Sequence, residues 1–296
     1  MRQGFNRHTQ RPAGGVQNER ARPLVLACYA FALAVLALGS MQHARADLML
    51  HPTRVVFERN TRAAQVDLIN RSAETAIYRI TLVNRRMDDV GQFSDADAAQ
   101  PGEAFADKLV RYSPRQVTLA PGAAQTVRIL LSKPPDLPAG EYRSHLLFQR
   151  VAGEQRPDKD GAPTSDLEIT LRALVSVSVP VIVRHGETSA TAEIGELRLR
   201  RGGSGEPLAS IELRRGGNRS VFGDLIFSFA PPEGAEVVVG RANGVAVYTP
   251  NAMRRAQLVL QPPAGVDLTR GTLRARFRER PEEGGKVLAE RTLQLP

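Results

Sequence analysis

Residues 167–179, LEITLRALVSVSV, decide the fold of this chain. Every odd position carries an apolar side chain: Leu167, Ile169, Leu171, Ala173, Val175, Val177 and Val179. Successive side chains of a β-strand point to opposite faces of a sheet, so this period of two predicts a single strand of about 13 residues. Most strands have about five or six residues. A strand this long extends past a small sandwich, and its surplus apolar side chains need a partner.

Short apolar segments separated by Gly- and Pro-containing turns lie on both sides of this stretch. Before it, the sequence predicts strands at 48–57, 63–70, 76–84, 109–119, 124–132 and 141–151, and a loop in the acidic residues 85–106. After it, strands are predicted at 190–200, 207–215, 221–229, 235–248, 256–261, 272–279 and 286–295. No helical period is present beyond residue 46. The pattern predicts an all-β chain with one β-sandwich domain at 47–186 and a second at 187–296.

The first 46 residues have the pattern of an export signal. Residues 1–23 are polar and rich in Arg, residues 24–38 form an apolar run of 15, and Ala44-Arg45-Ala46 follows. A basic start, a short apolar core and an A-x-A site are typical of a secretory signal peptide, and a membrane-spanning helix needs about 20 apolar residues. We therefore expect 1–46 to be a cleaved signal peptide that leaves Asp47 as the first residue and no membrane anchor.

The charge and cysteine content narrow the classes of function. The formal net charge of +9 falls to +4 once a leader with six Arg and one Glu is removed, which weakens a nucleic-acid-binding interpretation. The only cysteine, Cys28, lies in the leader, so the mature chain has no disulfide, zinc thiolate or thiol nucleophile. An exported chain of this kind fits the bacterial periplasm or exterior.

Motifs that carry catalytic chemistry are not visible. His51, His145 and His185 do not have metal-ligand spacing, and Asp88, Asp89, Asp95 and Asp97 lack the spacing of a calcium loop. Neither a phosphate loop nor a G-x-S-x-G elbow is present. We expect no enzyme activity, no metal site and no cofactor.

The chain resembles the periplasmic pilus-assembly chaperones of the PapD type over nearly all of its mature length. Four features carry this resemblance. They are His51-Pro52-Thr53-Arg54-Val55-Val56-Phe57 as the first-strand motif, Asn70-Arg71-Ser72 followed by Ala76-Ile77-Tyr78, Gly140-Glu141-Tyr142-Arg143-Ser144-His145-Leu146-Leu147-Phe148, and the alternating strand 167–179 that ends in Pro180-Val181-Ile182-Val183-Arg184.

This resemblance implies two immunoglobulin-like β-sandwiches in an L-shaped arrangement, with a cleft for a pilin or fimbrial subunit between them. It also implies donor-strand complementation, in which the chaperone lends its long strand to a subunit that lacks its last strand and then passes that subunit to an outer-membrane usher. Alternate apolar side chains would fill pockets in the subunit. The donor residues would be Leu167, Ile169, Leu171 and Ala173.

The resemblance also implies roles for individual charged residues. Arg54 matches the family arginine that binds the carboxylate at the end of a subunit, and a guanidinium suits a carboxylate geometrically. The Lys that accompanies it in the family is missing, so Arg172 is the candidate second cation. Glu141 and Arg184 match two members of an interdomain ion-pair network, and Arg276 stands where the third member, an acid, is expected.

Two other functions remain open at this stage. A secreted two-module adhesive or structural protein would have the same sandwiches without releasing a subunit, and a carbohydrate-active enzyme could also use a sandwich. An adhesin more often carries an exposed aromatic face, yet aromatic residues are only 5% of this chain. An enzyme needs clustered acids or histidines, which the sequence does not show.

Overall fold

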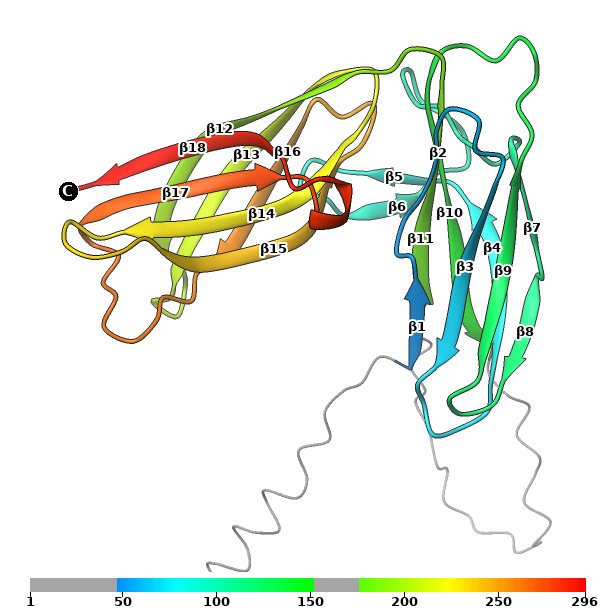
Figure 1. The fold of residues 1–296 in the computed structure, drawn as a ribbon, viewed down its shortest axis with the longest axis horizontal. Coiled ribbons are helices and arrows are strands. Elements are labelled where there is room, and N and C mark those ends of the chain that lie inside the picture. The colour runs from blue at the N-terminus through cyan, green and yellow to red at the C-terminus, as the bar shows by residue number, and fades with distance from the viewer. Residues whose placement is uncertain (1–46, 152–175) are drawn as a thin grey trace, which may run out of the picture. The chain divides into compact units, whose positions relative to one another are not determined.

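The structure, a computed structural model, describes residues 47–151 and 176–296. Within these ranges every regular element is a strand except the short 3-10 helix η1 at Pro281–Glu283 (Figure 1). The prediction of an all-β chain is confirmed. No helix in the described part of the chain is long and apolar enough to cross a membrane.

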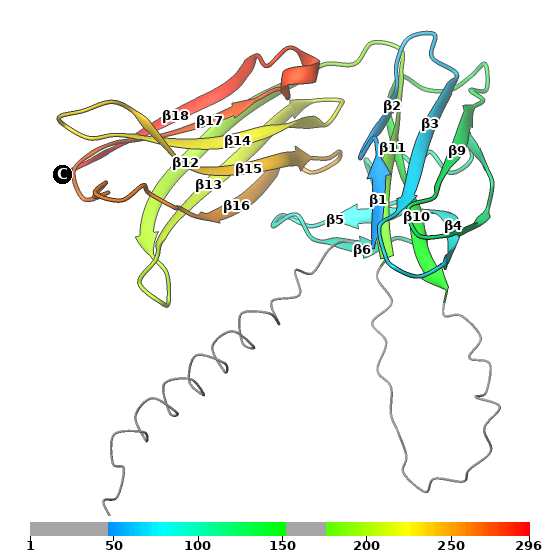
Figure 2. The same cartoon turned by 60° about the horizontal axis from the view of Figure 1, so that its bottom comes forward.

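The first sandwich has two sheets. One has the strand order β1-β3-β9-β7 and the other β2-β11-β10-β4-β8 (Figure 1), and Figure 2 shows β1, β3 and β9 of the first sheet from another side. In the first sheet, the bounds are Leu48–His51 for β1, Ala63–Asn70 for β3, Ala124–Leu131 for β9 and Val110–Ser113 for β7. In the second sheet, they are Val55–Phe57 for β2, Ser176–His185 for β11, Gly140–Val151 for β10, Ala76–Val83 for β4 and Gln116–Leu119 for β8. Both sheets contribute alternate apolar side chains to one core, among them the fully buried Phe57, Leu68, Ile129 and Phe148. Each such side chain contributes about 1.5–3 kcal/mol through burial.

The second sandwich has a core of its own. Its sheets have the orders β12-β13-β16 and β15-β14-β17-β18. In the first sheet, the bounds are Ala190–Arg201 for β12, Pro207–Gly217 for β13 and Met253–Val259 for β16. In the second, they are Val237–Val247 for β15, Val221–Ala230 for β14, Gly271–Arg278 for β17 and Val287–Leu295 for β18. Strand β17 shows the alternation clearly, because Leu273, Ala275 and Phe277 face the core while the arginines between them are only partly covered.

Two of the predicted strands are each divided between the two sheets. In 48–57, β1 pairs with β3 in one sheet, whereas β2 pairs with β11 in the other. In 109–119, β7 pairs with β9 and β8 pairs with β4. Pro52 and Pro114 lie at the two divisions. Proline has no N–H to donate to a ladder, so the strand ends there and the chain crosses to the opposite sheet.

The prediction of a loop at 85–106 is wrong for its first part. Strands β5 (Arg85–Met87) and β6 (Phe93–Asp95) pair as a hairpin. Met87 is buried in a small apolar cluster with Ile182, Ala246 and Tyr248. Three-residue strands are too short to show a period, so the acidic composition concealed the hairpin.

Polar contacts also join this hairpin to the second sandwich. The Asn251 side chain donates a hydrogen bond to the Met87 carbonyl at 2.8 Å. The backbone N–H of Arg255 donates to the Asp89 carbonyl at 2.6 Å, and the side chains of these two residues form an ion pair. The hairpin therefore links strands of both sandwiches.

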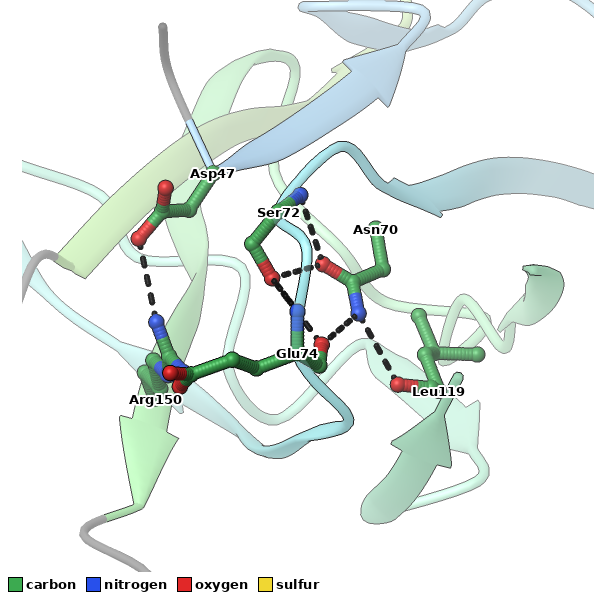
Figure 3. Close-up of polar contacts among 6 residues, drawn as sticks. All are labelled: Asp47, Asn70, Ser72, Glu74, Leu119 and Arg150. Carbon is green, nitrogen blue, oxygen red and sulfur yellow. Dashed lines mark hydrogen bonds and ion pairs between the residues drawn. The ribbon is translucent and has the colours of Figure 1, made fainter. Parts of the chain in front are cut away.

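A buried asparagine closes the turn after β3 (Figure 3). The Asn70 side-chain amide donates to the carbonyls of Leu119 at 2.9 Å and Glu74 at 2.7 Å. Its oxygen accepts from the backbone N–H and the hydroxyl of Ser72. A short polar side chain that bonds to the backbone two residues later is a common turn device. Here it also ties the turn to the end of β8.

The side chain and the backbone of Asp47 both contact the first sandwich. The Asp47 carboxylate lies 3.0 Å from a guanidinium nitrogen of Arg150, near the end of β10, and Glu74 lies 3.2 Å from the same guanidinium (Figure 3). The Asp47 carbonyl accepts from the Arg71 N–H at 2.8 Å. Asp47 is the residue at which the sequence predicts the mature chain to begin.

Candidate functional site

Arg54 stands where the chain has crossed from one sheet of the first sandwich to the other, directly before β2. Its Nε and one terminal nitrogen are buried, and neither has a hydrogen-bond partner among the described residues. The centre of its guanidinium lies 4.2 Å from the centroid of the Phe222 ring on β14. The ring's electron-rich face orients the cation and offsets part of its charge.

The Arg54 side chain lines a pocket of about 530 Å³. Residues of both sandwiches form its wall, including Val56 and Arg184 from the first and Ala192, Phe222 and Leu288 from the second. The pocket thus combines an arginine whose hydrogen bonds are not used with apolar surface beside it. This is the combination that a carboxylate-bearing chain end would need.

Burial dominates the electrostatics of Arg54. It lowers the pKa of this guanidinium, Arg184 lowers it further, and Tyr248 and Glu141 act in the opposite direction. A guanidinium nevertheless keeps its proton at neutral pH. A desolvated cation with unused donors is unfavourable, and an anion that reached it would stabilise it.

Arg143 shows that a buried arginine alone does not make this site. It is also buried and also has two nitrogens without hydrogen-bond partners. It packs over the rings of Tyr248 and Phe93, at 4.3 and 5.8 Å, and does not line the Arg54 pocket. Arg54, in contrast, lines the open volume of that pocket.

Glu141 and Arg184, which the resemblance assigns to one ion-pair network, are in contact. Arg184 Nε lies 3.1 Å from a carboxylate oxygen of Glu141, which is fully buried. Arg184 also forms an ion pair with Glu58 in the turn after β2. Glu141 lies on β10 and Arg184 lies directly opposite it on the paired strand β11.

The third member of this network is Ser220, which the sequence did not reveal. Its backbone N–H and its hydroxyl each donate to Glu141 at 3.0 Å, from the chain just before β14 in the second sandwich. Arg276, at the position where the third member was expected, instead forms ion pairs with Glu236 and Glu290. Asn218-Arg219-Ser220 resembles Asn70-Arg71-Ser72, and this was the only signal in the sequence.

We expect Glu141→Gln to lower the free energy of unfolding by about 1–3 kcal/mol, the usual effect of losing a buried charge-assisted hydrogen bond. The amide removes the charge that faces Arg184 and supplies one accepting oxygen where two now serve Ser220. Chemical unfolding measures the loss. Glu290→Gln is the control, because its pair with Arg276 is partly exposed and is worth at most about 1 kcal/mol. Equal losses for both variants would contradict the network's role.

His145 is a buried titratable group on the same strand as Glu141. It lies on β10, edge-on to the Phe93 ring, and its Nδ1 has no partner among the described residues. Its pKa is lowered from 6.5 to about 3, chiefly by burial and then by repulsion from Arg143 and Arg85. The unfolded chain therefore binds a proton that the folded chain does not between those two values. Stability is fully present above pH 6.5 and falls as the pH drops through this window.

We expect His145→Gln to make the free energy of unfolding fall less steeply with acidification. Urea unfolding at several pH values from neutral down to about 4 gives the slope, whatever the absolute stability of the variant. His51→Gln is the matched control, since His51 is exposed on β1. An unchanged slope in His145→Gln would show that another group causes the acid sensitivity.

The predicted donor residues Leu167, Ile169, Leu171 and Ala173, and the candidate second cation Arg172, lie outside the described residues. The described part of the same alternating sequence is β11, in which Val177 is partly buried and Val179 and Val181 are buried in the first core. Strand β11 pairs with β10 along one edge, and on its other edge β2 covers only Val181, Ile182 and Val183.

Comparisons with known proteins return fimbrial chaperones at low similarity. No family model and no curated protein sequence matches the chain. Among solved structures, it is similar to the E. coli chaperone DraB, at 12% identity and a TM-score of 0.40 over 84% of this chain and 96% of that one. It is similar to a SafB chaperone solved with a Salmonella enterica SafA pilin, at 14% and 0.40 over 85% and 97%. It is also similar to a CsuC–CsuE chaperone–tip subunit complex of Acinetobacter baumannii, at 11% and 0.40 over 84% and 98%.

Proposed function

We propose that this protein is a periplasmic chaperone that binds pilus or fimbrial subunits by donor-strand complementation and delivers them to an outer-membrane usher. The observation that carries the proposal is Arg54, a buried guanidinium with two unused nitrogens on the wall of a 530 Å³ pocket. Its proposed ligand is the C-terminal carboxylate of a subunit. A charge-assisted pair between the guanidinium and a carboxylate in the pocket would offset the desolvation of this cation.

The course of β11 supports the strand-donation part of the proposal. Within the described residues, the outer edge of Ser176–Pro180 pairs with no strand, because β2 reaches only Val181. An unpaired edge beside an alternating apolar sequence can add to the sheet of another protein. Since Val177 and Val179 turn toward the chain's own core, the subunit-binding part of the stripe is assigned to 167–173.

In this proposal, Arg54 and the donor strand contact different parts of the subunit. Arg54 fixes the end of the subunit and so sets the register in which its open groove meets the donor strand. The odd-numbered side chains then fill that groove, each contributing about 1.5–3 kcal/mol. Arg172 is an alternative second cation for the carboxylate. This mechanism uses no nucleotide, metal or cofactor, and it needs no catalytic residue.

The alternative function, a purely adhesive or structural two-module protein, does not explain the position of Arg54. Such a protein does not need an arginine on the wall of an open pocket. The pocket therefore favours a chain that binds an anionic partner.

Co-purification from the periplasm tests the proposal. The tagged full chain is expressed in its own host and the bound proteins are identified by mass spectrometry. We expect a stoichiometric partner that is a β-sandwich lacking its last strand, and its capture should be lost when its C-terminal residue is amidated or extended. Recovery of the chain alone, or with a partner that binds regardless of its C-terminus, would contradict the proposal.

A further inference from the structure

A second pocket, of about 260 Å³, lies in the first sandwich beside the turn between β2 and β3. Four basic side chains line it: Arg59 and Arg62 from that turn, Lys133 from the segment after β9, and His185 at the end of β11. The remaining lining includes the hydrogen-bonding side chains of Asn60 and Ser132. No Asp or Glu side chain is among its lining residues.

The positive charge of this pocket is not neutralised within the described residues. Arg59 and Arg62 form no ion pair there, and Glu58, the acid in the same turn, is occupied by Arg184 on the side of the Arg54 pocket. Lys133 donates its one protein hydrogen bond to the Arg184 carbonyl, at 2.9 Å. Arg59, Arg62 and Lys133 bring three positive charges to one small volume. Such a field attracts an anion of more than one charge.

Backbone contacts fix the turn that carries Arg59 and Arg62, two exposed residues. The Thr61 N–H donates to the Glu58 carbonyl at 3.0 Å, and the Leu131 N–H donates to the Arg62 carbonyl at 2.8 Å. Arg59 has a φ of 51°, and it is the one described non-glycine residue with a positive φ. Left-handed backbone in a residue other than glycine is uncommon and often marks a functional position. The turn presents Arg59 and Arg62 on a prearranged framework.

The charged form of Lys133 is destabilised in the free chain. Its pKa is lowered by burial and by the nearby Arg62. A cation that is partly desolvated beside another cation gains from any anion that binds between them. The convergence of charges, the fixed turn and the open volume all point to the same kind of ligand.

We propose that this pocket binds a phosphate- or sulfate-class oxyanion. A tetrahedral oxyanion carries up to two charges and several acceptor oxygens, which match two guanidinium groups, one ammonium group and the neutral donors. The volume leaves room for the group that carries the oxyanion. The oxyanion can be free in solution or belong to a lipid headgroup. This site is separate from the Arg54 pocket, and Thr61 is the one residue that lines both.

Calorimetric titration with inorganic phosphate tests the proposal on the full chain. Chloride at matched ionic strength is the reference. We expect saturable phosphate binding that Arg62→Gln and Lys133→Gln each weaken about tenfold, the effect of one charge-assisted hydrogen bond. Arg128→Gln is the matched control, because Arg128 is an exposed arginine of β9 in the same sandwich and does not line the pocket. Circular dichroism melts verify that each variant is folded.

A second arm distinguishes the sources of the oxyanion. Vesicles of phosphatidylglycerol are compared with vesicles of phosphatidylcholine in a sedimentation assay with the same variants. Selective binding to phosphatidylglycerol that Arg62→Gln and Lys133→Gln weaken, and that phosphate competes away, assigns the pocket to a lipid headgroup. Phosphate binding without vesicle binding assigns it to a free oxyanion. Failure of both probes, or an equal loss in Arg128→Gln, would overturn the proposal.

Discussion

Replacement of Arg54 by Ala should abolish subunit capture while the chain stays folded. In the proposed complex this guanidinium receives the subunit's carboxylate, and removing one partner of a buried charge pair weakens binding by roughly 2–5 kcal/mol. In the free chain, two of its nitrogens make no hydrogen bonds among the described residues, and its guanidinium packs over the Phe222 ring. The free chain therefore loses little when the side chain is shortened.

Matched variants make this result interpretable. Arg54→Lys keeps the charge but not the planar fork, so its capture should be intermediate. Arg128→Ala removes an exposed arginine of the same sandwich and should capture subunits normally. Pull-down yield from the periplasm is the measurement, with a thermal melt of each purified variant beside it. A wild-type yield for Arg54→Ala would show that Arg54 is not the anchor.

Substitutions in the alternating stripe should separate its two faces. Ile169→Glu or Leu171→Glu would place an unpaired charge in an apolar groove of the subunit, which is strongly unfavourable, so capture should fail. Thr170→Glu lies at an even position, which points away from the groove in a strand, and should have a far smaller effect. We expect all three variants to melt near the wild-type temperature.

The thermal melt decides between two roles for these side chains. If Ile169 and Leu171 were core residues of the chain itself, a buried Glu would unfold it by several kcal/mol, and capture would be lost for that reason. A normal melt with failed capture supports strand donation. Unfolding of both odd-position variants would contradict it at these positions.

The all-β fold was predictable because its signals are local. Alternation in segments such as β17 and Gly or Pro between segments identify strands and turns without knowledge of the partners. The divisions at Pro52 and Pro114 were less visible. The proline marks where pairing stops, but the sequence does not say that the chain then joins the opposite sheet. The hairpin of β5 and β6 was missed because strands of three residues carry no measurable period.

The candidate site was predictable only where a motif carried it. Arg54, Glu141 and Arg184 could be named from the resemblance, and the structure places the last two in contact. Phe222 and Ser220 could not be named, because they come from the second sandwich. Ser220 contacts Glu141 partly through its backbone N–H, a group that every residue except proline has. The basic pocket also joins distant segments, 59–62, 132–133 and His185, and none of them is distinctive alone.

Amide hydrogen exchange of residues 167–173, in the free chain and in the purified complex with its subunit, tests strand donation most directly. A donated strand forms backbone hydrogen bonds with the subunit, and these amides should then exchange at least about tenfold more slowly in the complex. The amides of β17, in the core of the second sandwich, serve as the internal reference and should not change. Equal exchange of 167–173 in the free chain and in the complex would contradict donor-strand complementation by this segment.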